Sequence, residues 1–185
     1  MLLSELMLFY SCFWVLINYR LLSNALSLLS IYPLLSSYAF SIPFTNLLIL
    51  LFSSYPLNGT LISIKNGNLL TTIELLISSL SFGFLFIILQ LKEFMFSYFS
   101  ISDSLIGSIF YFTTSLHGIH VLLGSFNFFL LLINSLFTIN CFSIEFSFTI
   151  YLISLYWHFV DFIWFLVFII YIILVYFLVS ILINK

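Results

Sequence analysis

The sequence predicts an all-α integral membrane protein, a single membrane domain built as a bundle of five transmembrane helices. Hydrophobic residues make up 64% of the 185 residues, charged residues make up only 5%, and the mean hydropathy is +1.31. This chain has too few charges to cover a soluble globule of its size. Apolar runs of roughly 20 residues, the length that crosses a bilayer at a rise of 1.5 Å per residue, recur along the whole sequence.

Polar and helix-breaking residues divide the apolar runs into five expected spans. A long loop rich in serine, with Pro33 and Pro43, follows the first span, because the residue before a proline is disfavoured in helical geometry. Residues 65–68, Lys-Asn-Gly-Asn, are typical of a tight turn, so the second and third spans should form an antiparallel hairpin. The last two runs are longer than a bilayer requires and should tilt or protrude. The expected spans are residues 2–22, 43–64, 69–91, 104–137 and 146–182.

The charge balance excludes several classes of partner. Four Lys and Arg stand against six Asp and Glu, and no basic amphipathic stretch is present, so neither nucleic acid nor an anionic lipid surface is expected to bind. The expected partners are lipid and other membrane helices. Alanine occurs only at Ala25 and Ala39, a bias typical of an AT-rich genome, and no removable leader is visible. Both observations indicate coding inside a mitochondrion.

Two histidines lie within the fourth expected span. On a helix, Thr113, His117, His120 and Gly124 follow spacings of four, three and four, which places them on one face. Ionisable groups at bilayer depth are retained where they meet a partner or serve a purpose. The histidines could ligate a metal or haem, or they could hydrogen-bond to neighbouring helices or lipid headgroups. Two imidazoles without a matching carboxylate or cysteine set make an incomplete metal site, so we expect no metal.

A stripe of mostly small residues lies beside the histidine face. Small residues let helix backbones approach closely in lipid, so the stripe predicts a packing seam with another span. The histidine face then points into the bundle or toward a lipid-lined cleft. The stripe consists of Gly107, Tyr111, Thr114, Gly118 and Ser125.

The fifth expected span carries a second polar stripe. Tyr151, Ser154, His158 and Asp161 follow spacings of three, four and three, and Trp157 flanks them. An Asp three residues after a His on one helix can accept its proton and keep the pair nearly neutral. The pair could be part of a proton relay, or it could be a structural pair that fixes helix packing.

The first expected span carries one carboxylate, Glu5, at its head. It either lies exposed at the helix start or lies deeper, where desolvation would favour the uncharged form and it could be protonated at neutral pH. The sequence contains no nucleophile elbow, no phosphate-cradling glycine loop and no paired carboxylates. Independent catalysis therefore has no candidate residues.

Four long motifs lie between residues 89 and 164. They are Leu89-Gln90-x-x-Glu93-Phe94, Phe99-x-Ile101-Ser102-Asp103, His117-Gly118-x-His120-Val121 and Tyr156-Trp157-His158-Phe159-Val160-Asp161-x-x-Trp164. Motifs of this length are highly specific, and these resemble the family of subunit III of mitochondrial cytochrome c oxidase.

The resemblance extends to the first half of the chain. Pro43 with Asn46 is similar to the start of the family's fourth helix, and Ser4-Glu5 with Phe13-Trp14 is similar to its third. By that mapping, Glu5 takes the place of the family's reactive membrane carboxylate. The resemblance covers the last five of the family's seven helices. It implies that the first two come from a separate chain or are absent.

The resemblance implies a supporting role in the proton-pumping oxidase of the mitochondrial inner membrane, where the chain would be a multi-pass subunit without a redox centre. Haem a and copper are then expected in the partner subunits I and II. The chain would bind phospholipid beside the catalytic subunit, keep proton uptake efficient and protect the oxygen-reducing centre. The residues implied for lipid or internal polar contacts are Glu5, His117, His120, His158 and Asp161, with Trp157 as an interfacial or packing anchor.

Two other classes of function stay open at this point. A stand-alone membrane proton or metal transporter could use the two polar stripes as a pathway. An independent haem-binding cytochrome could use His117 or His120 as a ligand.

Overall fold

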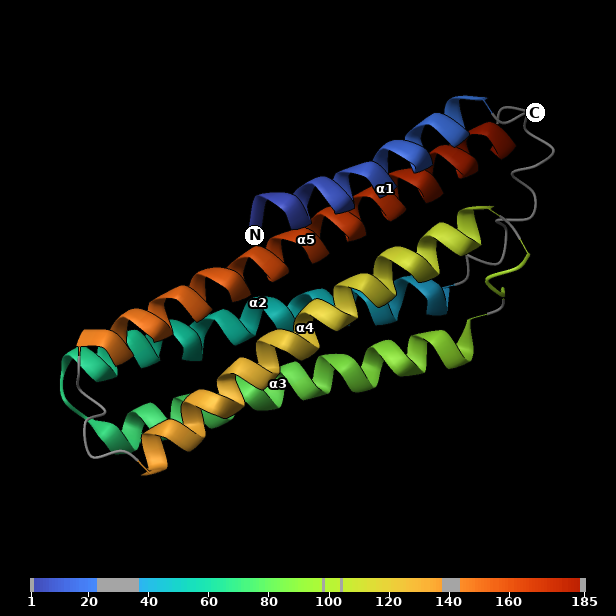
Figure 1. The fold of residues 1–185 in the computed structure, drawn as a ribbon. Helices are drawn as coiled ribbons and strands as arrows, with labels where there is room; N and C mark the ends of the chain where they lie inside the picture. Colours follow the sequence, from blue (N-terminus) through green and yellow to red (C-terminus); the bar gives the residue numbers. More distant parts are fainter. Residues whose placement is uncertain (1, 23–36, 98, 104, 138–143, 184–185) are drawn as a thin grey trace.

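The computed structural model describes residues 2–22, 37–97, 99–103, 105–137 and 144–183. Within them the chain forms five α-helices and no strand, which confirms the predicted all-α fold (Figure 1). Four of the described helices, α2 to α5, are long and apolar enough to cross a membrane, and α1 holds a shorter apolar stretch. The helices are α1 (Leu2–Leu22), α2 (Ser37–Lys65), α3 (Leu69–Phe96), α4 (Leu105–Phe137) and α5 (Ile144–Ile183).

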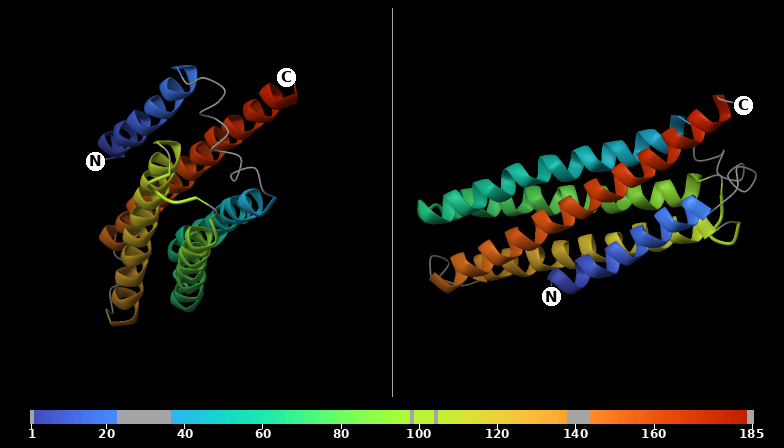
Figure 2. Two further views of the ribbon diagram at one scale, coloured as in Figure 1. Left: turned by 90° about the vertical axis from the view of Figure 1, so that its right-hand side faces the viewer. Right: turned by 90° about the horizontal axis from the view of Figure 1, so that it is seen from above.

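Helices α2, α3, α4 and α5 form a four-helix bundle of up-down-up-down topology. Each packs against two neighbours, in the order α2, α3, α4, α5 and back to α2. Helix α1 lies outside this bundle and packs against α4 and α5. It begins about midway along the bundle and lies on the side of α4 and α5 that faces away from the α2–α3 pair (Figures 1 and 2).

The α2–α3 connection is the tight antiparallel turn that the sequence predicted. The amide of Asn66 bonds the carbonyl of Ile62 at 3.1 Å, and Gly67 has a φ of +74°, which suits a residue without a side chain. The start of α2 differs from the prediction. Residues 37–42, expected in the serine-rich loop, are helical, and Pro43 lies inside the helix. The rest of that loop falls outside the described residues. In hydrocarbon the backbone must bond to itself, so a helix can continue past a proline.

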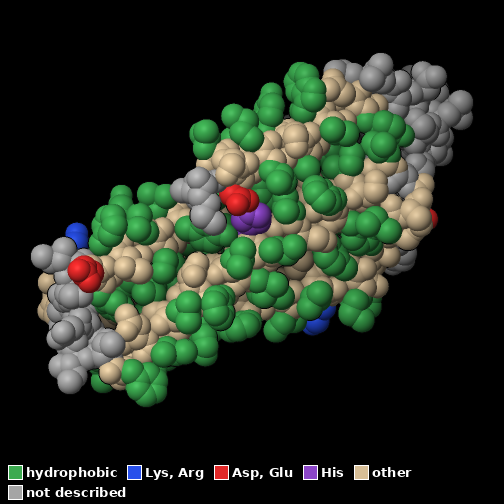
Figure 3. Space-filling model, in the orientation of Figure 1, with side chains coloured by type: hydrophobic (Ala, Val, Ile, Leu, Met, Phe, Trp, Pro, Cys, Tyr) green, Lys and Arg blue, Asp and Glu red, His purple; other side chains and the backbone are tan. Residues whose placement is uncertain are grey.

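Buried positions on α2 and α3 recur at alternating spacings of three and four. This spacing is the mark of helices packed at about 20°, as in left-handed bundles. Between the seams the helices expose large hydrophobic side chains, which are spread over the face seen in Figure 3, as a lipid-facing surface requires. The seam positions are Asn46, Leu50, Ser53, Leu57 and Thr60 on α2, and Thr72, Leu76, Ser79, Gly83, Phe86, Gln90 and Glu93 on α3.

The predicted small-residue seam on α4 packs against α3. A Cβ added to Gly83 would meet the side chain of Ser125, and the rings of Phe94 and Tyr111 lie 5.2 Å apart. The prediction is wrong for Gly118, which has no atom within 4 Å of an added Cβ. No neighbouring helix approaches the stripe at this position, so Gly118 is not part of the packing contact.

Trp157 of α5 is one of the largest fully buried side chains of the bundle. It is fully buried against Gly124 of α4, where an added Cβ would lie 2.8 Å from its ring, and against Gly83 of α3, where the gap would be 3.1 Å. Its indole N–H donates a hydrogen bond to Ser53 of α2 at 2.8 Å. One side chain therefore contacts all three other helices of the bundle.

This contact predicts opposite results for two alanine substitutions on α4. Gly124→Ala should lower the free energy of unfolding by about 1–3 kcal/mol, because a rigid indole ring occupies the space that the methyl group needs. Gly118→Ala, where the space is open, should be neutral or stabilise by up to about 1 kcal/mol. Thermal unfolding of the purified assembly measures both. Equal effects of the two variants would contradict the packing described.

Candidate functional site

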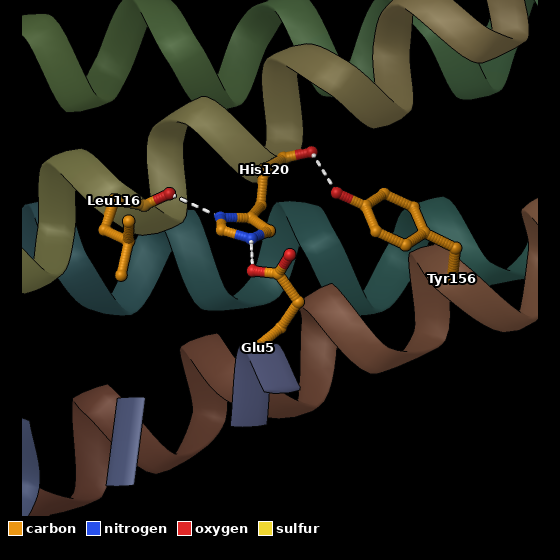
Figure 4. Close-up of polar contacts among 4 residues, drawn as sticks. All are labelled: Glu5, Leu116, His120 and Tyr156. Atoms are coloured by element: carbon orange, nitrogen blue, oxygen red, sulfur yellow. Dashed lines mark hydrogen bonds and ion pairs between the residues drawn. The ribbon is translucent and has the colours of Figure 1, made fainter. Parts of the chain in front are cut away.

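Glu5 and His120 form a hydrogen-bonded pair that joins α1 to the middle of α4 (Figure 4). The Glu5 carboxylate meets Nε2 of His120, while Nδ1 of His120 lies 2.7 Å from the carbonyl oxygen of Leu116. Because a carbonyl only accepts, Nδ1 carries a proton and donates. The pair is then either an imidazolium with a carboxylate or a neutral imidazole with a carboxylic acid. In both forms it is neutral overall, which suits hydrocarbon surroundings.

The surroundings of this pair come from three helices. Tyr156 of α5 donates its hydroxyl hydrogen to the carbonyl oxygen of His120 at 3.2 Å, and the ring of Phe9 lies 5.6 Å from the imidazole in an edge-on arrangement. The side chain of His120 is 9% exposed and that of Glu5 is 25% exposed. Glu5 therefore lies at the contact between α1 and α4. Its exposure is intermediate between the two possibilities left open by the sequence, an exposed helix start and a deeper position.

His117 lies one turn from His120 in a separate environment. It is fully buried, with its ring centroid 4.8 Å from Trp164 and 5.4 Å from Phe86. Neither of its ring nitrogens has a hydrogen-bond partner among the described residues. The two histidines share the predicted face of α4, yet they do not converge: His120 contacts α1, and His117 contacts α3 and α5. Among the described residues no three His, Cys, Asp or Glu side chains are grouped as a metal site requires.

The polar stripe on α5 is divided between two surroundings. Tyr151 is exposed and Ser154 is buried, so the residues of the stripe differ in their exposure. Nδ1 of His158 and Oδ2 of Asp161 lie 3.9 Å apart, too far for a hydrogen bond, and the two side chains are 42% and 9% exposed. The imidazole therefore faces outward while the carboxylate faces the bundle. Trp157 of the same helix lies in the core, at the glycine contacts described above.

Three further polar residues lie inside the bundle and were not singled out as site residues from the sequence. Asn46, Gln90 and Trp164 are buried, and the polar atoms of their side chains have no hydrogen-bond partner in the described part of the chain. A buried polar group left unpaired costs about 1–3 kcal/mol. The spacing held a signal for them: Asn46 lies four residues before Leu50 and Gln90 four after Phe86, each in step with the buried seam.

A groove of about 480 Å³ separates α1 from the first turns of α4. Its two hydroxyl groups already donate within their own helices, Ser11 to the carbonyl of Leu8 at 2.7 Å and Ser108 to that of Leu105 at 2.8 Å. The walls are therefore apolar in effect and suit a hydrocarbon chain. The groove is lined by Ser11, Cys12 and Val15 of α1, Ile101 of the α3–α4 turn, and Ser108, Ile109 and Phe112 of α4.

Comparisons with known proteins agree with the fold and with these motifs. The family described as cytochrome c oxidase subunit III matches residues 1–178. Cytochrome c oxidase subunit 3 of Drosophila yakuba is 36% identical over 165 residues, which cover 88% of this chain and 62% of the fly protein. The subunit 3 of Heterololigo bleekeri is 34% identical over 87% of this chain and 62% of its own length. That of Papio hamadryas is 37% identical over 66% of this chain and 46% of its own length.

The Glu5–His120 pair predicts energetic coupling between α1 and α4. Glu5→Leu or His120→Phe alone should each cost about 1–3 kcal/mol of stability, because each leaves the other polar group without its partner in an apolar contact. The double variant should cost less than the two single variants together, by at least about 0.5 kcal/mol. Thermal unfolding of the membrane assembly measures all three.

The matched control for this comparison of single and double variants is Glu74→Leu, which removes an exposed carboxylate of α3. It should show no coupling with His120→Phe. Additive effects of the Glu5 and His120 substitutions would show that the pair does not hold α1 in place.

Proposed function

The chain belongs to the cytochrome c oxidase subunit III family, and from this premise we propose that it is a subunit of cytochrome c oxidase that carries no redox centre. The family match over residues 1–178 is the observation that carries the proposal. The chain spans about 62% of the length of the Drosophila yakuba and Heterololigo bleekeri relatives. Its proposed location is the mitochondrial inner membrane, as a multi-pass subunit beside subunits I and II.

The surroundings of the two histidines that could ligate a metal support the assignment of haem a and copper to the partner subunits. His120 is engaged on both ring nitrogens, by Glu5 and by the Leu116 carbonyl. His117 is enclosed by the rings of Phe86 and Trp164, which leave no space for a porphyrin face. Neither imidazole is available as an axial ligand without dismantling its surroundings.

The groove between α1 and α4 supports a role in binding phospholipid. Ile101, in the turn before α4, marks its end near the membrane surface, and Phe112 marks its inner end. A single acyl chain entering beside the turn would run inward along α4, with its headgroup at the surface. This direction leads toward His120, two turns beyond Phe112 on the same helix. Lipid held there would connect the outer helix α1 to the bundle.

The same arrangement provides a route by which the subunit supports proton uptake and the lifetime of the catalytic subunit. The Glu5–His120 pair is neutral in both of its protonation arrangements, so it places no net charge in the membrane beside a proton-uptake path. The lipid would fill the space next to α1 and keep the protein surface dry. Both effects act on the neighbouring subunit and require no reaction in this chain.

Purification under mild conditions tests the assignment. Isolated through a tag on this chain, the assembly should contain haem a and copper, while the chain separated from its partners should hold neither. Mass spectrometry of every membrane polypeptide in the preparation identifies the partners and shows which of them supplies sequence matching the rest of the relatives' length.

Three results would overturn the proposal. A chain that purifies alone and moves protons or metal ions in liposomes would be a transporter. A Soret band in the isolated chain that is lost on His117→Phe or His120→Phe would make it a cytochrome. Recovery in a membrane assembly without a terminal oxidase would exclude the role described.

The groove predicts a specific effect on bound lipid. Ser108→Trp should fill it and reduce the phospholipid retained per complex, as counted by native mass spectrometry. Ile119→Trp, which adds the same bulk to an exposed position of α4, should leave the count unchanged. Loss of lipid in both variants, or in neither, would show that the groove is not the binding site.

A further inference from the structure

Four unpartnered polar side chains, one from each helix of the bundle, lie at one level of its interior. They are Asn46 of α2, Gln90 of α3, His117 of α4 and Trp164 of α5, and we call them the polar layer. Each is 4% exposed or less. Both amide atoms of Asn46 and Gln90, both ring nitrogens of His117 and the indole nitrogen of Trp164 lack a partner among the described residues.

Ring contacts place three of these residues together. His117 and Trp164 have centroids 4.8 Å apart, and Phe86 touches both, at 5.4 Å and 5.1 Å. Gln90 follows Phe86 by four residues, so it lies on the same face of α3, one turn further on. The glutamine amide therefore lies just beyond the phenyl ring that covers His117 and Trp164.

The pairing of α2 with α5 sets the level of Asn46. Ser53 accepts the hydrogen bond of Trp157, and the rings of Phe44 and Phe168 lie 6.0 Å apart. Asn46 lies between Phe44 and Ser53 on α2, as Trp164 lies between Trp157 and Phe168 on α5. The two antiparallel helices therefore carry Asn46 to the level of Trp164.

The pairing of α2 with α3 gives the same answer independently. The hydroxyl groups of Ser63 and Thr72 are 2.8 Å apart at the hairpin end. The two helices are antiparallel, so positions equally far from this contact, back along α2 and forward along α3, lie opposite each other. This count brings Asn46 opposite the turn of α3 that holds Gln90. All four side chains occupy seam positions, so all four point into the bundle.

The geometry of the rings prevents His117 and Trp164 from hydrogen-bonding to each other. The planes of His117 and Trp164 are only 34° apart, so each ring presents its face to the other, whereas N–H groups and ring nitrogen lone pairs lie in the ring planes. Phe86 meets both rings edge-on, at 70° and 88°, and offers no polar atom. The nitrogens of both rings therefore point past their ring partners.

We propose that the polar layer is a binding site for ordered internal water, which bridges the four helices. The layer mixes donors and acceptors: indole and amide N–H groups donate, amide oxygens accept, and the imidazole does both. Water is a small ligand that both donates and accepts hydrogen bonds, and a buried water makes about three of them. A bare cation would satisfy only the amide oxygens and the acceptor nitrogen of the imidazole, and would leave the N–H groups unpaired.

The site also reaches a carboxyl group. Glu93 follows Gln90 by three residues on the seam of α3, is buried, and has one oxygen, Oε2, without a partner in the described residues. Water in the layer extends toward this oxygen. The bridging water thus supplies hydrogen bonds to buried groups of α3 that no helix neighbour provides.

Electron cryomicroscopy of the intact membrane complex in nanodiscs, at a resolution that shows ordered water, tests the proposal. Compact density should lie within hydrogen-bond distance of the indole nitrogen of Trp164 and of at least one of the two amides. Trp157 is the internal control, because its indole N–H already donates to Ser53 and should have no such density. Direct bonds among the four side chains, with no density between them, would overturn the proposal, and so would elongated density continuous with a lipid.

Two variants extend the test. Gln90→Leu removes one side of the site at similar volume and should abolish part of the density. Ser79→Ala, on the same seam, removes a hydroxyl that is already bonded to the carbonyl of Leu75 and should leave the density unchanged. Identical density in the wild type and Gln90→Leu would contradict the site. If Gln90→Leu does not assemble, the map of the unmodified complex still decides.

Discussion

The cost of exposing polar side chains to lipid is the constraint on which the packing of these helices depends. A charged or imidazole group facing hydrocarbon costs several kcal/mol, so its position is set by what it can contact. His120 meets Glu5 across the α1–α4 contact, and Trp157 meets Ser53 across the α5–α2 contact. The helix arrangement follows from these contacts together with close packing at small residues such as Gly124.

The sequence predicted the helices well because their causes are local. Long apolar runs specify spans, and the Lys-Asn-Gly-Asn turn specifies the hairpin through a glycine with positive φ. Residues 37–42 were predicted as loop because rules for proline learned in water overstate its effect in lipid, where the backbone has no other donor or acceptor.

The contacts between helices were harder to predict, because they depend on which faces meet. The spacing put His117 and His120 on one face of α4, which is correct, yet it could not show that one contacts α1 and the other α3 and α5. The depth of Glu5 depended on the placement of α1 against α4, which no local pattern encodes. Asn46 and Gln90 follow the alternating spacing of three and four that marks the buried positions of α2 and α3. This pattern becomes clear only when the whole helix is considered.

The measurement that tests the account most directly is the oxygen accessibility of single nitroxide labels along α4 in lipid bilayers. The polar face of α4 is buried in protein, whereas Ile119 and Leu122 are 53% and 49% exposed on the lipid side. Labels at His117→Cys and His120→Cys should therefore show low oxygen accessibility, and labels at Ile119→Cys and Leu122→Cys should show high accessibility. Equal accessibility at the four positions, or the reverse order, would contradict it.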